Sequence, residues 1–346
     1  MNSPVYDTGR VIVGRAETLK AAFDRFNEQP IDLDFTLPEG SPYPFSMKRT
    51  TLGGACSVSG PGTFEGKTRS TLTFSRPHDK GWWIDRTDLP DQFPIPVSVR
   101  SVWTTARNIV LRSGNPHNYL RMVEHIIAFR LGLGLDDVQV SVGSGDPPLF
   151  DRGNLDIYEA MEKVGIVETD EPAPFCTVRE PLTFVGERGD FLTFIPAKPG
   201  QYGLRVDCAI DFPSVIGRQR LVYDLTPETF RTGSQARTNA PYSAFLMALT
   251  VGKLFAETRN LGYTRDNILI HGRKKYLNEP HLCYAEHGGR SFEAVWHRST
   301  LDLLAAVSLL DAGRFAGTIL SYRAGHTQDV VMCSALQLHR HIVPLA

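Results

Sequence analysis

The sequence has no excess of charge of either sign, because its 37 Lys and Arg residues are balanced by 38 Asp and Glu residues over 346 positions. Nucleic-acid-binding proteins usually carry a basic excess, so this balance argues against a nucleic-acid partner. No apolar run reaches the roughly 18 residues that a membrane-spanning helix needs, and the first residues lack the basic and apolar regions of a secretory signal. We therefore expect a cytoplasmic protein without a membrane span.

Cysteine is scarce and scattered. The five Cys residues are odd in number and none stands in C-x-x-C spacing, which is typical of a reducing compartment and excludes a cysteine-ligated zinc site. The sequence also has no G-x-S-x-G element, no P-loop and no G-x-G-x-x-G. Catalysis by a Ser or Cys nucleophile, or a nucleotide held by a glycine-rich loop, therefore has little support.

The order of elements along the chain indicates two domains. Short β-type runs separated by Gly, Pro and Asp are followed by helical periodicity, and this order occurs once before and once after a Pro-rich linker at 171–174. We expect an N-terminal extension at 1–45, a first α+β domain at 46–174 and a second α+β domain at 175–346. The apolar spacing predicts helices over 118–131, 156–164, 244–261 and 292–311, and one that starts after His326.

Glu124 and His125 are the first candidates for chemistry, because they are adjacent in an apolar helix. Metal-dependent hydrolysis uses such a pair, with the imidazole on the metal and the carboxylate taking a proton from water. The alternative is structural: Glu124 would lie on a solvated face and His125 would be a hydrogen-bonded core residue.

His297 and Asp302 form a second candidate pair, but their spacing of five is unfavourable on a regular helix. At ~100° per residue the two side chains would point about 140° apart. A π-bulge would bring them to one face, and such bulges favour functional sites, so we predict a local widening of the helix near 298–301. The alternative is a helix entry at which Asp302 interacts with the helix dipole.

His326 is the third candidate. It follows a strand-like run at 319–322 and stands where a helix is expected to begin. A helix N-terminus favours the neutral imidazole, which can then be tuned for acid–base work. An exposed, purely structural histidine is the alternative.

Taken in order, these residues and several further motifs resemble the UDP-3-O-acyl-N-acetylglucosamine deacetylases, the zinc amidases of lipid A synthesis. The motifs that carry the resemblance are Gly60–Gly66, Val123–His125 with Gly132–Asp137, Pro148–Asp151, Ala209–Phe212 with Ile216–Gln219, Phe230, Ala236–Thr238, Asp266 with Asn267, and Gly325 with His326. The resemblance extends from about Thr50 to the end of the chain.

The resemblance implies an α+β fold of two similar halves, each a sheet with helices, packed face to face with the helices between the sheets. It also implies roles for individual residues: zinc ligands His125, His297 and Asp302; general base Glu124; oxyanion donor Thr238; general acid His326; and substrate contacts Phe64, Asn239 and Arg298, the last to a phosphate. The implied substrate is an acylated UDP-amino sugar. The implied protein is a monomer that could contact a membrane only peripherally, through the acyl chain.

The sequence departs from the family pattern at the same site. Phe64 stands where the family has His, Asn239 and Ala240 replace Phe-Gly, and Ala306 replaces an Asp that partners the acid histidine. One extra residue also separates His297 from Asp302. A second hypothesis therefore stays open, namely a catalytically impaired paralogue that binds a sugar nucleotide, a lipid or a protein partner.

Overall fold

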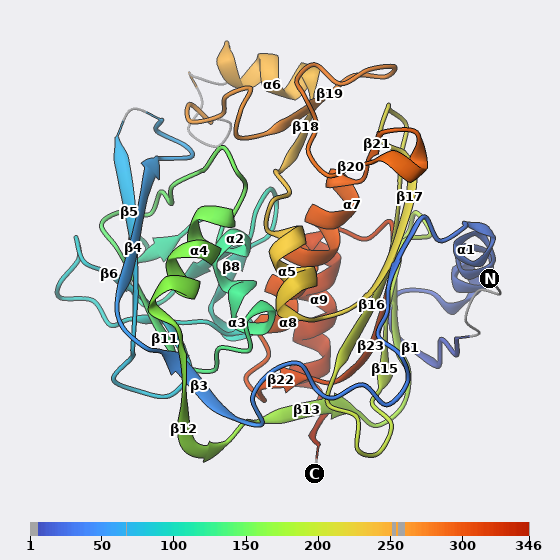
Figure 1. Cartoon of the computed structure of the whole chain (residues 1–346), viewed down its shortest axis with the longest axis horizontal. Helices are drawn as coiled ribbons and strands as arrows, with labels where there is room; N and C mark the ends of the chain where they lie inside the picture. Colours follow the sequence, from blue (N-terminus) through green and yellow to red (C-terminus); the bar gives the residue numbers. More distant parts are fainter. Residues whose placement is uncertain (1–5, 67, 251–253, 255–259, 346) are drawn as a thin grey trace.

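The computed structural model describes residues 6–66, 68–250, 254 and 260–345. Two β-sheets lie on opposite sides of the molecule with helices between them (Figure 1). A single hydrophobic cluster joins Leu72 of one sheet, Val206 of the other and Leu304 of a helix between them. The structure therefore confirms the expected α+β architecture with the helices between the sheets.

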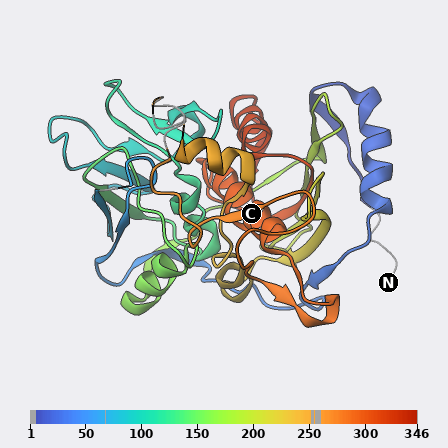
Figure 2. The same ribbon diagram turned by 90° about the horizontal axis from the view of Figure 1, so that it is seen from above.

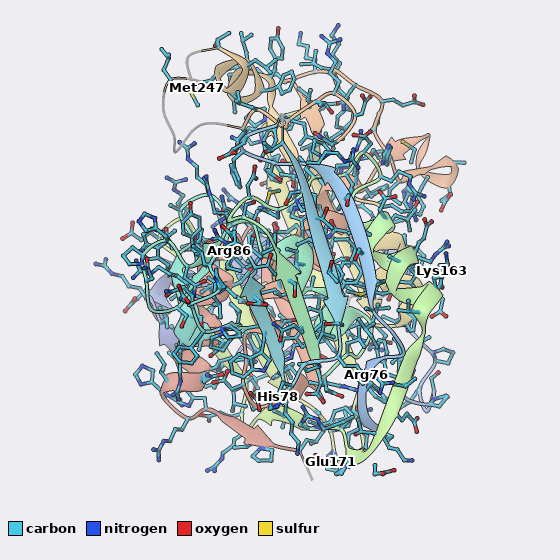
Figure 3. The ribbon with its side chains drawn as sticks, turned by 90° about the vertical axis from the view of Figure 1, so that its left-hand side faces the viewer. Arg76, His78, Arg86, Lys163, Glu171 and Met247 are labelled. Carbon is cyan, nitrogen blue, oxygen red and sulfur yellow. The ribbon has the colours of Figure 1, made fainter. Side chains whose placement is uncertain are left out.

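The first sheet is five-stranded and belongs to the first half of the chain. Its spatial order is β4 (Cys56–Pro61), β5 (Arg69–Ser75), β11 (Val138–Val142), β6 (Trp82–Arg86) and β7 (Ile95–Pro96). Side chains of β5 alternate between exposed and buried, as expected for a sheet with one solvated face. Figure 3 views this half of the molecule, with Arg86 toward one end and Arg76 and His78 toward the other.

The second sheet is seven-stranded and mixes parallel and antiparallel pairs. Its spatial order is β1 (Arg10–Val13), β14 (Leu182–Val185), β15 (Phe191–Pro196), β23 (Gly317–Tyr322), β16 (Leu204–Phe212), β17 (Gly217–Asp224) and β2 (Leu33–Phe35). The central strands are buried on both faces, because one face meets the helices between the sheets and the other meets α1 (Figure 1).

Five smaller sheets complete the fold of the described residues. They pair β3 (Lys48–Leu52) with β12 (Ile166–Pro172); β8 (Val102–Thr104) and β10 (Tyr119–Leu120) with β9 (Val110–Arg112); β22 (Arg314–Phe315) and β24 (Ile342–Pro344) with β13 (Phe175–Val178); β18 (Asn239–Pro241) with β19 (Leu269–His271); and β20 (Cys283–Tyr284) with β21 (Arg290–Ser291). β12 ends at Pro172 and β13 begins at Phe175, so the expected linker is the short connection between them. The division of the chain at residue 174 stays a prediction.

Most α-helices of the described residues have eight residues or fewer, and three are longer, with 10 or 13 residues. The α-helices are α1 (Ala16–Glu28), α2 (Glu124–Ile127), α3 (Phe129–Gly132), α4 (Leu155–Val164), α5 (Pro227–Gly233), α6 (Tyr242–Leu249), α7 (Glu293–His297), α8 (Leu303–Ser308) and α9 (His326–Leu338). Of these, α3, α8 and α9 lie between the sheets (Figure 1). Among the described residues, no helix has the length and apolar character needed to cross a membrane.

The N-terminal segment is part of the second sheet. β1 pairs in parallel with β14 at one edge, and β2 pairs in parallel with β17 at the other. Between them, α1 lies on the outer side of the sheet, as the view from above in Figure 2 shows. The sequence predicted only an extension at 1–45 and not its pairing with the second sheet, because strand pairing across more than a hundred residues leaves no local signal.

Several predicted helices differ in their bounds. The prediction of one helix over 118–131 was wrong: β10 occupies its start, Met122 takes a left-handed conformation with φ 52°, and α2 begins only at Glu124. The helix predicted over 244–261 is observed as α6, and most of its second half lies outside the described residues. The predictions for α4 and α9 are confirmed within one residue.

Candidate functional site

The helix that carries His297 and Asp302 changes its winding between them. α7 ends at His297, residues Arg298–Asp302 form a π-helical turn, and α8 follows directly. This confirms the predicted widening. The wider turn compensates for the spacing of five, so that His297 and Asp302 line the same pocket and His297 Nδ1 lies 3.7 Å from Asp302 Oδ1.

His125 and His297 converge on Thr238, although they come from opposite halves of the chain. Thr238 Oγ1 lies 3.0 Å from Nε2 of His125 and 3.1 Å from Nε2 of His297. The two Nε2 atoms are 3.4 Å apart. Burial lowers the pKa of both imidazoles, that of His125 to about 4, so both are neutral at physiological pH.

Asn154 fixes the tautomer of His125. Its Nδ2 donates to the carbonyl oxygen of His125 at 2.7 Å, which leaves its Oδ1 to accept from His125 Nδ1 at 3.1 Å. With the proton on Nδ1, the Nε2 lone pair points toward Thr238 and His297. An outer partner of this kind is what orients a metal-binding histidine. Sequence reasoning assigned no role to Asn154.

The Nε2 atoms of the two imidazoles are spaced to bind one zinc ion, whereas the third expected ligand, Asp302, is not in position. Tetrahedral Zn–N bonds of about 2.0–2.1 Å place two ligand nitrogens roughly 3.4 Å apart, which is the observed separation of the two Nε2 atoms. Asp302 lies instead beside Nδ1 of His297. In the described part of the chain, no group of three or more His, Cys, Asp or Glu side chains is arranged to hold a metal ion. The third ligand would therefore require a rotation of the Asp302 side chain.

Glu124 is buried at the start of α2 and lines the same pocket. The backbone N–H of Ile109 donates to its Oε2 at 3.0 Å. Burial, with a further contribution from the charge of Asp302, raises the pKa of Glu124 to about 8. A carboxyl group tuned to this range can act as a proton acceptor and donor near neutral pH.

A buried ion pair positions Thr238 relative to α7. Arg237 Nε donates to Glu293 Oε1 at 2.8 Å, and the backbone N–H of Arg237 donates to the same oxygen. Glu293 stands at the start of α7, four residues before His297. The pair therefore links the segment that carries Thr238 to the helix that carries His297, with both charges removed from solvent.

His326 occupies the first turn of α9 and lines the pocket. Its Nε2 lies 2.9 Å from the carbonyl oxygen of Thr105 and must donate to it, because a carbonyl accepts only. The neighbouring Thr327 hydroxyl donates to the same oxygen at 2.8 Å. His326 therefore carries a proton on the nitrogen that is held toward Thr105.

Arg298 does not occupy the expected position. Its side chain is buried, its Nη2 forms an ion pair with Asp329 Oδ1 at 2.6 Å, and its Nε donates to the carbonyl oxygen of Ala324 at 2.7 Å. It does not line the pocket that contains His297. The expectation of a phosphate contact conflicts with this geometry. The local sequence could not predict the Arg298–Asp329 ion pair, because Asp329 lies 31 residues further along the chain.

The pocket has a volume of about 230 Å³ and brings together most of the expected site residues. Phe64 and Asn239 line it, as do Glu124, Thr238, His297, Asp302 and His326. Sequence reasoning missed the other lining residues, which are Arg107, Asn108, Arg121, Met122, Asn260 and Tyr263. Nothing in the local sequence marks them, because their position depends on how the loops before β9 and α2 meet the second half of the chain.

Comparisons with known proteins agree on one family. Residues 49–337 match the family model described as UDP-3-O-acyl N-acetylglycosamine deacetylase. The UDP-3-O-acyl-N-acetylglucosamine deacetylase of Bdellovibrio bacteriovorus is 30% identical over 260 residues, covering 74% of this chain and 79% of that protein. The protein of the same name from Brucella ovis is 29% identical over 289 residues, covering 83% and 94%.

Proposed function

The chain belongs to the UDP-3-O-acyl N-acetylglycosamine deacetylase family, and from this premise we propose that it hydrolyses the N-acetyl amide of a UDP-3-O-acyl-N-acetylglucosamine-like substrate in lipid A biosynthesis. The observation that carries the proposal is the convergence of His125 and His297 on Thr238, with Glu124, Thr238 and His297 lining one pocket. These groups suit attack of water on an amide carbonyl.

A zinc ion held by His125, His297 and Asp302 completes the proposed site. The two neutral imidazoles with converging Nε2 atoms support this choice, and nitrogen and carboxylate ligands suit zinc. When bound, the ion supplies positive charge that activates water and polarises the amide carbonyl. Asn154 keeps His125 in the tautomer that can ligate.

The chain's own residues then divide the proton transfers. Glu124 accepts the proton of the attacking water on a carboxylate oxygen, and burial keeps its pKa close to the working range. The Thr238 hydroxyl donates a hydrogen bond to the oxyanion that develops on the carbonyl oxygen. His326, whose Nε2–H is held by the Thr105 carbonyl oxygen, donates a proton from Nδ1 to the leaving nitrogen, so that acetate and a free amine are released. Phe64 and Asn239 contact the sugar from the pocket wall.

The test compares three proteins loaded with zinc. Wild-type protein should release acetate from UDP-3-O-acyl-N-acetylglucosamine. Glu124→Gln should keep its zinc, measured by atomic emission, and lose turnover by about 100-fold or more, since general acid–base catalysis contributes 10²–10⁴-fold. Glu162→Gln, an exposed position on α4, is the matched control and should behave as wild type. Loss of activity in both variants, or in neither, would remove Glu124 from the reaction.

The same experiment tests the second hypothesis, a catalytically impaired paralogue. A paralogue without catalysis would bind the sugar nucleotide and release no acetate even when fully loaded with zinc. The departures at Phe64 and Ala306 motivated that hypothesis. The pocket nevertheless keeps Asp302 and His326 despite the changed spacing, and no described contact favours the paralogue.

A further inference from the structure

Helix α6 is apolar on both of its faces, although only one of them packs against the protein. The helix contains no charged residue. Phe245 and Ala248 are buried on the inner face, whereas Tyr242, Leu246 and Met247 on the outer face are 45–48% exposed. A surface helix normally carries polar side chains on its outer face. The outer face of α6 is therefore suited to contact with an apolar environment.

Three consecutive cations, Arg273, Lys274 and Lys275, lie in a tight turn that follows β19. The turn is fixed by the backbone N–H of Gly272, which donates to the carbonyl oxygen of Lys275 at 2.9 Å. All three residues are exposed, and none of them forms an ion pair with another described residue. The turn therefore presents concentrated positive charge to the solvent.

The pairing of β18 with β19 places the apolar helix and the basic turn side by side. The two strands are parallel, with Pro241 opposite His271, so the chain leaves both strands at the same end. α6 begins directly after Pro241, and the turn begins directly after His271. Figure 1 shows α6 and β19 together at one end of the molecule, and Figure 3 shows Met247 at that end. The helix and the turn therefore belong to one surface.

No acidic residue offsets the charge within this surface. Neither α6 nor the turn at 272–275 contains Asp or Glu. The acidic residues closest in sequence to the turn are Asp266 and Glu279, whose backbone carbonyl oxygens accept from Nη1 and Nη2 of Arg237 at 2.9 and 2.8 Å. Because the Arg237 side chain is buried, these contacts hold the backbone of both residues on the inner side of the ribbon.

We propose that the surface formed by α6 and the turn at 272–275 docks on a bilayer that contains anionic phospholipid. The cations contact the headgroups, and the outer face of α6 enters the boundary between headgroups and acyl chains. Charge complementarity favours this partner, because a layer of negative charge above an apolar layer matches exposed cations beside an uncharged helix. No residue of α6 or of the turn lines the pocket that contains Glu124, so the surface is separate from the proposed reaction site.

The experiment measures co-sedimentation of the full chain with lipid vesicles in the absence of substrate. Vesicles of phosphatidylglycerol mixed with phosphatidylcholine should bind the wild-type protein roughly tenfold or more tightly than vesicles of phosphatidylcholine alone, because only the former attract the basic turn. Binding to the anionic vesicles should fall steeply at about 1 M salt, where the screening length is about 3 Å.

Two variants test the two parts of the surface separately. Lys274→Gln combined with Lys275→Gln should weaken binding to anionic vesicles by about 25-fold, since each surface cation contributes about fivefold, or roughly 1 kcal/mol. Leu246→Gln should weaken it by about 4- to 12-fold, because roughly half of a Leu side chain would no longer leave water.

Each variant has a matched control away from this surface. Lys163→Gln combined with Lys198→Gln removes two exposed cations from α4 and from the connection after β15. Leu338→Gln replaces a side chain that is 61% exposed at the end of α9. Both controls should bind anionic vesicles as the wild-type protein does.

Four results would overturn the docking surface. They are equal binding to neutral and anionic vesicles, the same loss in the control pair of lysines as in the test pair, no loss in Leu246→Gln, and a dimer that forms without lipid and is abolished by Leu246→Gln. The last result would assign the outer face of α6 to a second copy of the chain. Acetate release is a separate readout, so the proposed function stands or falls independently of vesicle binding.

Discussion

Replacement of Arg298 by methionine should destabilise the fold rather than weaken substrate binding. The Arg298–Asp329 pair is buried, with side-chain exposures of 8% and 0%. Arg298→Met would leave the Asp329 carboxylate without its cation and the Ala324 carbonyl without its donor. Removal of one partner from a buried ion pair costs about 3–5 kcal/mol. That is a large part of the roughly 5–15 kcal/mol by which a typical protein is stable.

Urea unfolding followed by fluorescence measures the loss in the free energy of unfolding. Steady-state kinetics on the folded fraction measures kcat and KM. Because Arg298 begins the π-helical turn that ends at Asp302, kcat should fall while KM changes little. Arg314→Met is the matched control: it breaks another buried pair, with Asp136, in a residue that does not line the pocket. It should cost a similar free energy of unfolding and leave kcat unchanged.

A double replacement tests whether the buried charge is the cause. Arg298→Met combined with Asp329→Leu removes both charges and should recover most of the lost stability, because a buried ion pair can be replaced by apolar residues at little net cost. The reasoning is refuted if Arg298→Met changes the free energy of unfolding by less than about 1 kcal/mol and raises KM by about tenfold. Such a result would return Arg298 to the role of a phosphate ligand.

Three further outcomes are expected. Zinc at about 100 times its Kd should raise the free energy of unfolding of wild-type protein by about 2.7 kcal/mol and leave His125→Ala unaffected; equal stabilisation of both would place the metal elsewhere. Gly132→Ala should cost roughly 1–3 kcal/mol in urea unfolding, since its Cβ would lie 2.3 Å from the buried Phe230 ring, whereas Gly54→Ala has space and should be neutral. Alkylation at pH 8, followed by mass spectrometry, should label exposed Cys283 first. Burial raises the pKa of all five thiols, but Cys176, Cys208 and Cys333 are also inaccessible to the reagent. Labelling of these three before the protein unfolds would contradict their burial.

The parts of the fold that follow local patterns could be predicted from the sequence. The alternation at 138–142 defined β11, and the apolar spacing with Gly165 at its end defined α4. The π-helical turn was also predictable, because the spacing of His297 and Asp302 leaves no other way to bring both side chains to one face. In each case the relevant residues lie within one or two turns of each other.

The features that sequence reasoning missed depend on distant contacts. The partner of Arg298 is Asp329, and the orienting group of His125 is Asn154, 29 residues further along. Arg121 looked like an ordinary polar position in a predicted helix. Its stacking on Phe64 becomes visible only when the loop that follows β4 is placed against the start of α2.

The position of β1 and β2 at opposite edges of the seven-stranded sheet bears on the order of events during synthesis. These strands leave the ribosome before the strands that they pair with, so their contacts form late. Arg10 pairs with Glu180, 170 residues downstream, and Asp32 accepts from the backbone of Arg220, 188 residues downstream. Contacts of such long range slow folding. The first strands must therefore remain unpaired until most of the chain has been made. Their docking then covers the edges of β14 and β17 and leaves two strands of only four and three residues as the outer edges of the sheet, and short edge strands limit pairing with another molecule.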